Sequence, residues 1–159
     1  MATWVTLPTL AEKTLLTALH MNNIKNDIDI IRSPALHYYL RGSGDADYTT
    51  SSTTYADIDT TNVNATLTLT GNPVRIKFYA GRHNNAATAG EIDLLIDGVS
   101  IRAGTPIWRA GAGTPVNLEW VASGLSAGSH TFKLQWRMVG AGAFTLPSAN
   151  GVWFEVREQ

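Results

Sequence analysis

Polar and apolar residues alternate along much of this chain, and the longest alternation follows a turn sequence at residues 124–128. There Phe132, Leu134, Trp136 and Met138 fall on one side of an extended chain, and polar residues fall on the other. Successive side chains of a strand point to opposite faces, so this period of two predicts a strand with one buried face. We expect it to be a central strand of an antiparallel β-sandwich.

The same period recurs from residue 53 to the end of the chain and predicts about eight strands. Asp97-Gly98 stands between two alternations, which is a strong hairpin signal because both turn positions need a positive φ. The segments 81–90, 103–115 and 140–151 are rich in small and polar residues, and we expect them to be loops. We therefore predict a mainly β fold, namely an antiparallel, jelly-roll-like β-sandwich preceded by an N-terminal α-helix. The residues expected to face inward are Ile76, Phe78, Leu94, Ile96, Val116, Leu118, Trp120, Phe132, Leu134, Trp136, Phe154 and Val156.

A helical pattern precedes the sandwich. Thr17 is a candidate helix start, residues 18–32 follow it, and Ser33-Pro34 ends the helix. Its apolar residues are spaced three, four and three apart, which is the spacing of a heptad seam. The seam residues are Met21, Ile24, Ile28 and Ile31.

Two interpretations of this seam remain open. The helix could lie on the sandwich of its own chain, as most amphipathic helices do. It could instead join identical copies, which is the interpretation we favour. Isoleucine along a seam suits three or four helices better than two, so a homotrimer is expected.

The pattern suggests three parts. Residues 1–34 form an N-terminal arm and helix for anchoring or oligomerisation, 35–52 form a connector, and 53–159 form the β-sandwich domain. Within the connector the apolar stretch from Leu36 to Leu40 could pair as an edge strand. The Gly, Ser and Asp residues that follow it are typical of a turn.

Composition and charge exclude several classes of function. Charged residues make up 16% of the chain, against about 25% in a typical soluble domain, and the formal net charge is −1. No basic cluster is present, so we expect no nucleic-acid partner. The chain has no cysteine, no apolar run long enough to cross a bilayer and no signal-peptide pattern. We expect no membrane insertion.

One motif resembles a catalytic signature. Residues 124–128 match G-x-S-x-G, the pattern of a nucleophile elbow, which requires a helix after the serine. Here a strand follows, and only His130 lies beyond Ser126 with no acid placed to form a triad. We interpret the motif as a turn, assign no catalytic residue and expect a protein that is not an enzyme.

The sequence supports no assigned metal or cofactor. The four histidines have no zinc-binding spacing. Asp45 with Asp47, and Asp57 with Asp59, have a D-x-D spacing that could contribute to a Ca²⁺ site or form a solvated face. A full calcium-loop signature is missing, so calcium stays open and no cofactor is predicted.

Four aromatic residues fall off the predicted inward faces. Tyr38, Tyr39 and Trp108 are candidate ligand contacts, because exposed aromatic rings can stack on sugars. Trp and Tyr are also enriched in subunit interfaces. We assign Trp153 to such an interface.

Two parts of the chain resemble structural proteins of tailed bacteriophages. The first resembles the short N-terminal module of virion and tail-associated proteins, and the second resembles the β-sandwich that often follows this module. The matching residues of the first part are Thr3-Trp4-Val5, Leu16-Thr17-Ala18, Asn22, Asn23, Asp27, Ile28 and Pro34. Those of the second part are Asp97-Gly98, the stretch 124–131, Gln135-Trp136-Arg137 and the stretch 154–158.

The resemblance implies a non-enzymatic virion component of tail, fibre, receptor-binding or capsid-decoration type, commonly trimeric. Such a protein would be located in the virion and would act through self-assembly and through surface display or adhesion. Its expected partners are further copies of itself, other virion proteins and, as a candidate, a glycan of the host surface. The alternative is a carbohydrate-binding β-sandwich module.

Overall fold

The structure is a computed structural model that describes residues 35–159 except 83, 86–88, 104 and 112. These residues belong to one compact unit. The expected N-terminal helix, with its seam of Met21, Ile24, Ile28 and Ile31, lies outside the described residues. The helix and the homotrimer inferred from it therefore stay predictions.

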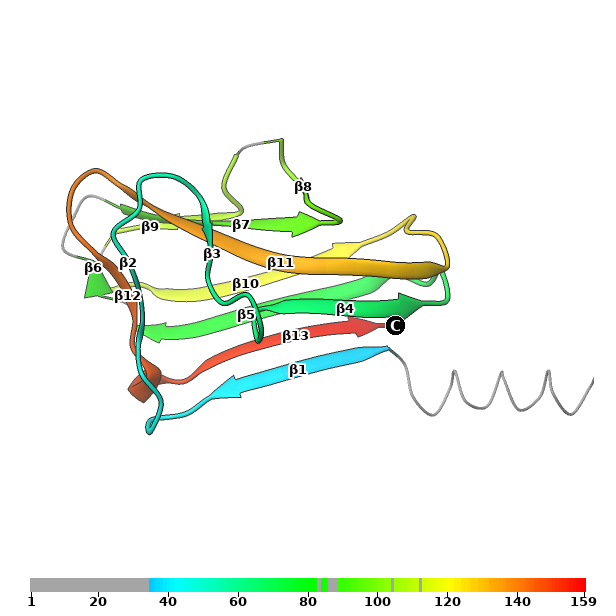
Figure 1. Cartoon of the computed structure of the whole chain (residues 1–159), viewed down its shortest axis with the longest axis horizontal. Helices are drawn as coiled ribbons and strands as arrows, with labels where there is room; N and C mark the ends of the chain where they lie inside the picture. The colour runs from blue at the N-terminus through cyan, green and yellow to red at the C-terminus, as the bar shows by residue number, and fades with distance from the viewer. Residues whose placement is uncertain (1–34, 83, 86–88, 104, 112) are drawn as a thin grey trace, which may run out of the picture. The chain divides into compact units, whose positions relative to one another are not determined.

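The described chain is mainly β, with antiparallel sheets and one short 3-10 turn, Ser148–Asn150. Two of the sheets face each other across a common core (Figure 1). The strands are β1 (Leu36–Arg41), β2 (Tyr48–Thr50), β3 (Ala56–Asp57), β4 (Asn64–Leu69), β5 (Val74–Arg82), β6 (Asn84–Asn85), β7 (Ala89–Ile96), β8 (Val99–Ser100), β9 (Trp108–Ala110), β10 (Pro115–Ala122), β11 (Gly128–Val139), β12 (Phe144–Leu146) and β13 (Val152–Glu158).

The chain passes repeatedly from one main sheet to the other. One sheet has the order β1-β13-β5-β10. In the other, β11 lies between β7 on one side and both β3 and β4 on the other, and β7 also pairs with β8 and β9. A third, small sheet of β2, β12 and β6 lies at one end of the sandwich (Figure 1). The predicted central strand is confirmed, since β11 has neighbours on both sides.

The described residues contain thirteen strands, so the prediction of about eight was too low. Apart from β1, the additional strands are β2, β6, β9 and β12, which have two or three residues each and are too short to show a period of two. The segments 81–90, 103–115 and 140–151 were expected to be loops, but they contribute β6, β9 and β12, respectively. The expected connector 35–52 contributes β1 and β2, and β1 pairs with β13 along its whole length.

The core is built from alternate residues of both sheets, and most of the predicted inward residues are in it. Trp136 packs edge-on against Tyr48, and its ring is tilted by 53° to that of Phe144. Trp120 is an exception, because 36% of it is exposed. It follows the inward alternation of β10, but β10 is an edge strand, and a period of two does not reveal how far the opposite sheet extends over an edge.

The predicted hairpin at Asp97-Gly98 is confirmed. Asp97 has a φ of 52° and Gly98 a φ of 80°, and the two residues join β7 to β8. Both values lie in the left-handed region that this type of turn requires. The turn leaves the Asp97 carboxylate at the end of the sheet, where it contacts β11.

Candidate functional site

The outer face of β1 carries large apolar side chains that remain exposed. Leu36, Tyr38 and Leu40 are 53%, 56% and 57% exposed, respectively. Side chains alternate along a strand, so all three point away from the core, on the same side. We call these three residues the β1 stripe. An exposed run of apolar residues on one strand is unusual in a monomer and indicates a contact surface.

The other side of β1 is fixed to the sandwich by polar contacts. The Arg41 guanidinium lies 4.0 Å from the centre of the Tyr48 ring and donates a 3.2 Å hydrogen bond to the Tyr39 hydroxyl. His37 Nε2 lies 2.9 Å from the main-chain oxygen of Asn62. These contacts set which face of β1 points outward, and that face bears the β1 stripe.

Asp59 is the acceptor at the centre of this polar group. Its carboxylate accepts hydrogen bonds from the Tyr48 hydroxyl, the Asn62 side chain and the main-chain amides of Thr61 and Asn62. Burial opposes its charge, but the hydrogen bonds, led by the one from Tyr48, lower the pKa of Asp59 to about 2. Burial and the same hydrogen bond raise the pKa of Tyr48. Asp59 therefore acts as a fixed anion that orders the segment between β3 and β4.

The rest of this outer face is more polar. Arg75 pairs with Glu155 at 3.2 Å and Lys77 with Glu119 at 3.4 Å, both across neighbouring strands. The apolar surface of the sheet therefore lies mainly on its β1 side.

One aromatic pair continues the β1 stripe across the outer face of the sheet, onto β13 and β5. Leu40 is opposite Trp153 of β13, and Trp153 is opposite Tyr79 of β5. The Trp153 and Tyr79 rings are stacked, with centroids 6.2 Å apart and an angle of 25° between their planes. Trp153, the residue assigned from sequence to an interface, thus lies on the same outer face as the β1 stripe.

The other predicted ligand-contact aromatics are engaged within the chain. Trp108 of β9 stacks on the buried Phe144, with centroids 5.9 Å apart and an angle of 7°. Tyr39 is half-buried, and its hydroxyl accepts a hydrogen bond from Arg41. Of the three candidates, Tyr38 has its ring on the exposed outer face.

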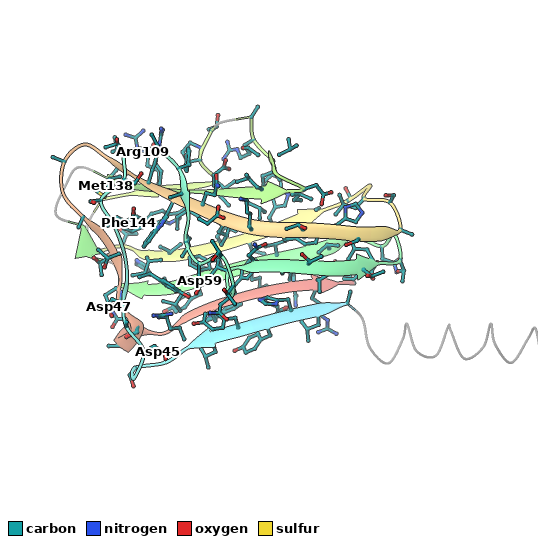
Figure 2. The ribbon with its side chains drawn as sticks, viewed as in Figure 1. Asp45, Asp47, Asp59, Arg109, Met138 and Phe144 are labelled. Carbon is teal, nitrogen blue, oxygen red and sulfur yellow. The ribbon has the colours of Figure 1, made fainter. Side chains whose placement is uncertain are left out.

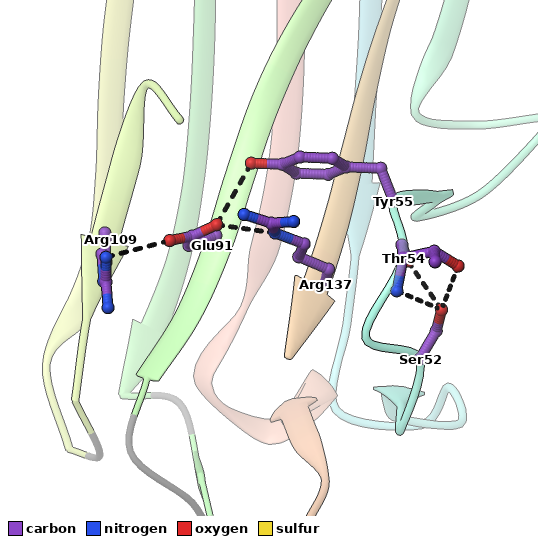
Figure 3. Close-up of polar contacts among 6 residues, drawn as sticks. All are labelled: Ser52, Thr54, Tyr55, Glu91, Arg109 and Arg137. Atoms are coloured by element: carbon purple, nitrogen blue, oxygen red, sulfur yellow. Dashed lines mark hydrogen bonds and ion pairs between the residues drawn. The ribbon is translucent and has the colours of Figure 1, made fainter. Parts of the chain in front are cut away.

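The second sheet carries a buried ionic cluster on its outer face (Figure 3). Glu91 of β7 is 2% exposed and pairs with Arg137 of β11 at 2.7 Å and Arg109 of β9 at 3.3 Å. The Tyr55 hydroxyl lies 3.3 Å from the same carboxylate, and the Arg137 guanidinium lies 4.6 Å from the centre of the Tyr55 ring. The cluster binds the segment before β3 to the sheet, so we interpret it as structural.

The two D-x-D pairs are engaged separately. Asp45 accepts from the Gly42 amide and Asp47 from the Ser148 amide and hydroxyl. Asp57 contacts Lys133 and Gln135, whereas Asp59 contacts Tyr48 and Asn62. Figure 2 shows Asp59 apart from Asp45 and Asp47. Among the described residues no group of three or more acidic or histidine side chains is placed to hold a metal ion.

The structure brings Asp97, Ser126 and His130 together. His130 Nδ1 lies 2.7 Å from the Asp97 carboxylate, and Nε2 lies 3.0 Å from the main-chain oxygen of Ser126. Two acceptors thus face the two ring nitrogens, an arrangement that suits a protonated imidazolium. The hydrogen bond with Asp97 raises the pKa of His130, and hydrogen bonds from the Thr131 amide and His130 lower the pKa of Asp97. The imidazole is directed to a carbonyl and not to the Ser126 hydroxyl.

Comparisons with known proteins give no family. No family model and no curated protein matches the chain. Within the described residues no helix is long and apolar enough to span a membrane.

The solved structures that are similar are distant. The infectious bursal disease virus VP2 subviral particle has a TM-score of 0.36 and 13% identity, over 79% of this chain and 38% of that one. Dimeric latent PorU from Porphyromonas gingivalis has a TM-score of 0.27 and 10% identity, over 79% and 13%. The structure of infectious bursal disease virus Gt strain has a TM-score of 0.26 and 13% identity, over 77% of this chain and 36% of that one. The chain therefore spans less than half the length of each, and likeness at this level carries no conclusion about function.

Proposed function

We propose that this protein is a non-enzymatic structural component of a phage virion, of tail, fibre or capsid-decoration type, that acts by assembling with copies of itself. The observation that carries the assembly in this proposal is the β1 stripe, in which three large apolar side chains are each more than half exposed on one strand. The assignment to a phage virion rests on the resemblance of the sequence. This strand directly follows the segment with the predicted heptad seam. Two apolar surfaces adjoining in sequence favour assembly over a monomeric role.

The strand order supports classifying the sandwich as a jelly roll. Eight strands remain when β2, β3, β6 and β12 are set aside and β8 and β9 are counted as one strand. In chain order, the first, eighth, third and sixth of these strands form one sheet. The second, seventh, fourth and fifth form the other. Each sheet thus takes strands alternately from both halves of the chain, as two Greek keys do.

The mass of the full chain in solution tests this proposal. Light scattering should give a trimer or a larger symmetric assembly for the wild type. Ile24→Asp with Ile28→Asp places charges in the seam and should reduce the mass while the β-sheet circular dichroism is kept. The matched control is Asn22→Asp with Asn26→Asp, which adds the same charges on the predicted polar side and should not change the mass. A wild type that stays monomeric at high concentration would contradict the proposal.

The alternative is carbohydrate binding, and the stacked Tyr79–Trp153 pair on the outer face favours it. A sugar ring could stack on such a surface. A glycan array and titration of the best ligand against Trp153→Ala would test this function. Binding by a monomeric wild type, lost in Trp153→Ala, would favour this alternative over assembly.

A further inference from the structure

We infer that β1 is a self-pairing strand, which joins antiparallel to β1 of a second copy of this chain across a twofold axis. The inference rests on the proposed function in that both require contact between copies, but it names a separate surface and a register. It follows from the direction of the β1 backbone, the side chains that this backbone carries and the contrast with the other edge of the same sheet.

The backbone direction follows from one hydrogen bond. The Glu158 amide donates to the Ala35 carbonyl at 3.0 Å, so these two opposed residues form a hydrogen-bonded pair. In an antiparallel ladder such pairs alternate with pairs whose N–H and C=O groups point away. The register runs without interruption from Leu36 opposite Arg157 to Arg41 opposite Val152. The amide and carbonyl groups of Leu36, Tyr38 and Leu40 therefore point to the free edge of β1.

The residues with the free backbone groups are also the residues of the β1 stripe. Among the described strands, β1 pairs only with β13. Its edge has neither a proline nor a bulge, and its only formal charge is Arg41 at its end. Edges of this kind are ready templates for another strand.

The opposite edge of the sheet is protected. There β10 begins with Pro115, has a register shift beside it and carries the exposed Glu119. These are features that prevent edge-to-edge pairing. Two edges of one sheet thus differ in the way expected if one is used for assembly and the other is not.

The sequence of β1 is complementary to itself in one register. With Tyr38 opposite Tyr38 of the second copy, Leu36 is opposite Leu40 and the stripes of both copies form one apolar surface. In this register Leu36, Tyr38 and Leu40, whose backbone groups point to the free edge, form hydrogen-bonded pairs with the second copy. Three such pairs give about six new hydrogen bonds. The Arg41 residues lie at opposite ends, so no like charges face each other.

The contact is too small to be the only one. Even complete burial of the three half-exposed side chains of each copy would amount to on the order of 500 Å², below the ~1,200 Å² at the low end of stable interfaces. Strand pairing therefore acts between copies that are also held elsewhere, for which the predicted seam in residues 1–34 is the candidate. A threefold seam and a twofold strand contact together would generate an extended lattice or a closed shell.

Cross-linking traps a weak contact and reads its register. The chain has no cysteine, so a single introduced cysteine is a unique reporter. Opposed Cα atoms in a hydrogen-bonded pair lie about 5.5 Å apart, within the range of a disulfide. In the full chain, Tyr38→Cys should give a covalent dimer under mild oxidation. Leu36→Cys should cross-link poorly alone and well when mixed with Leu40→Cys. Val121→Cys, at a similarly exposed position (51%, against 56% for Tyr38) on the outer face of β10, is the matched control and should give little dimer.

The outcomes separate this inference from the proposed function. Tyr38→Lys should abolish assembly beyond the species held by the seam, while Val121→Lys should leave the mass unchanged. The inference is overturned if Tyr38→Cys cross-links no better than Val121→Cys while the seam variants still reduce the mass. If Tyr38→Cys dimerises and the seam variants change nothing, strand pairing stands and the seam assembly fails. A Tyr38→Lys variant that unfolds as a monomer, without cross-linking of Tyr38→Cys, would show that the chain covers its own stripe and would also overturn the inference.

Discussion

Glu91 is only 2% exposed, and its buried carboxylate forms ion pairs with two arginines. Glu91→Gln should lower the free energy of unfolding by about 1–3 kcal/mol, since both guanidinium groups lose a charged acceptor. The lower end is expected because Arg109 and Arg137 are partly exposed and water can solvate them. Urea denaturation measures the change. Glu119→Gln, which removes an exposed ion pair with Lys77, is the control and should cost about 0–1 kcal/mol.

His130 makes stability depend on pH. Its pKa in the folded chain is raised above the ordinary value of 6.5 by Asp97, and that of Asp97 is lowered. A raised histidine pKa adds stability that is complete below the unfolded pKa and is lost as the pH rises through the folded pKa. The free energy of unfolding should therefore contain a component that declines from about pH 6 upward.

Two variants isolate that component in urea titrations between pH 5 and pH 9. His130→Gln removes the titrating group, and Asp97→Asn removes its anion while keeping a residue that tolerates the positive φ of the turn. Both should flatten the decline. A decline of the same size in His130→Gln would assign it to another group.

Some contacts between single residues could not have been predicted from sequence. One oxygen of Glu158 accepts hydrogen bonds from the Thr70, Gly71 and Asn72 amides and from the Thr70 hydroxyl. The turn was visible in Gly71-Asn72-Pro73, but the acceptor comes from the other end of the chain. Neither period nor turn chemistry carries information about a contact between residues so far apart in sequence.

At the level of elements, Gly90 allows β7 to pass against the aromatic core. A Cβ at this position would lie 2.7 Å from ring atoms of Phe144, which is fully buried and also contacts Trp108 and Trp136. Gly90→Ala should therefore cost about 1–3 kcal/mol through overpacking. Thermal unfolding followed by tryptophan fluorescence measures it. Gly42→Ala, where nothing lies within 4 Å of the added Cβ, should change the midpoint little.

Two tryptophans with the same alternation test the extent of the core. Trp136 is 3% exposed on the central strand, whereas Trp120 is 36% exposed on an edge strand. Trp136→Ala should cost on the order of 3–5 kcal/mol from lost transfer and the cavity left behind. Trp120→Ala should cost less, because part of its surface is already in water. If urea denaturation gave the same loss of unfolding free energy for both variants, this would contradict the difference in burial between the two tryptophans.

The long strands could be predicted from sequence because they bury one face over many residues. Phe132, Leu134 and Trp136 needed no tertiary information to be placed. The short β6, β9 and β12 depend on pairing with distant strands, and their residues show no period. The same limit applied to the candidate site. Leu36, Tyr38 and Leu40 could be recognised as an edge strand, but only the contacts of Tyr39 and Arg41 determine which of its faces is exposed.

For the whole molecule, the two proposed contact surfaces are mostly apolar, and the formal net charge is −1. Association through such surfaces and through backbone hydrogen bonds is screened little by salt, whereas exposed ion pairs weaken over a Debye length that shrinks from about 30 Å at 0.01 M to about 3 Å at 1 M. The assembled mass should therefore stay constant or rise as NaCl is increased from low to molar concentration. Sedimentation velocity across this series measures it. The Ile24→Asp/Ile28→Asp variant, for which a reduced mass is expected, serves as the reference for salt effects on the sandwich itself. Dissociation of the wild type at high salt would assign the contact to charged groups and would count against both the seam and the β1 stripe.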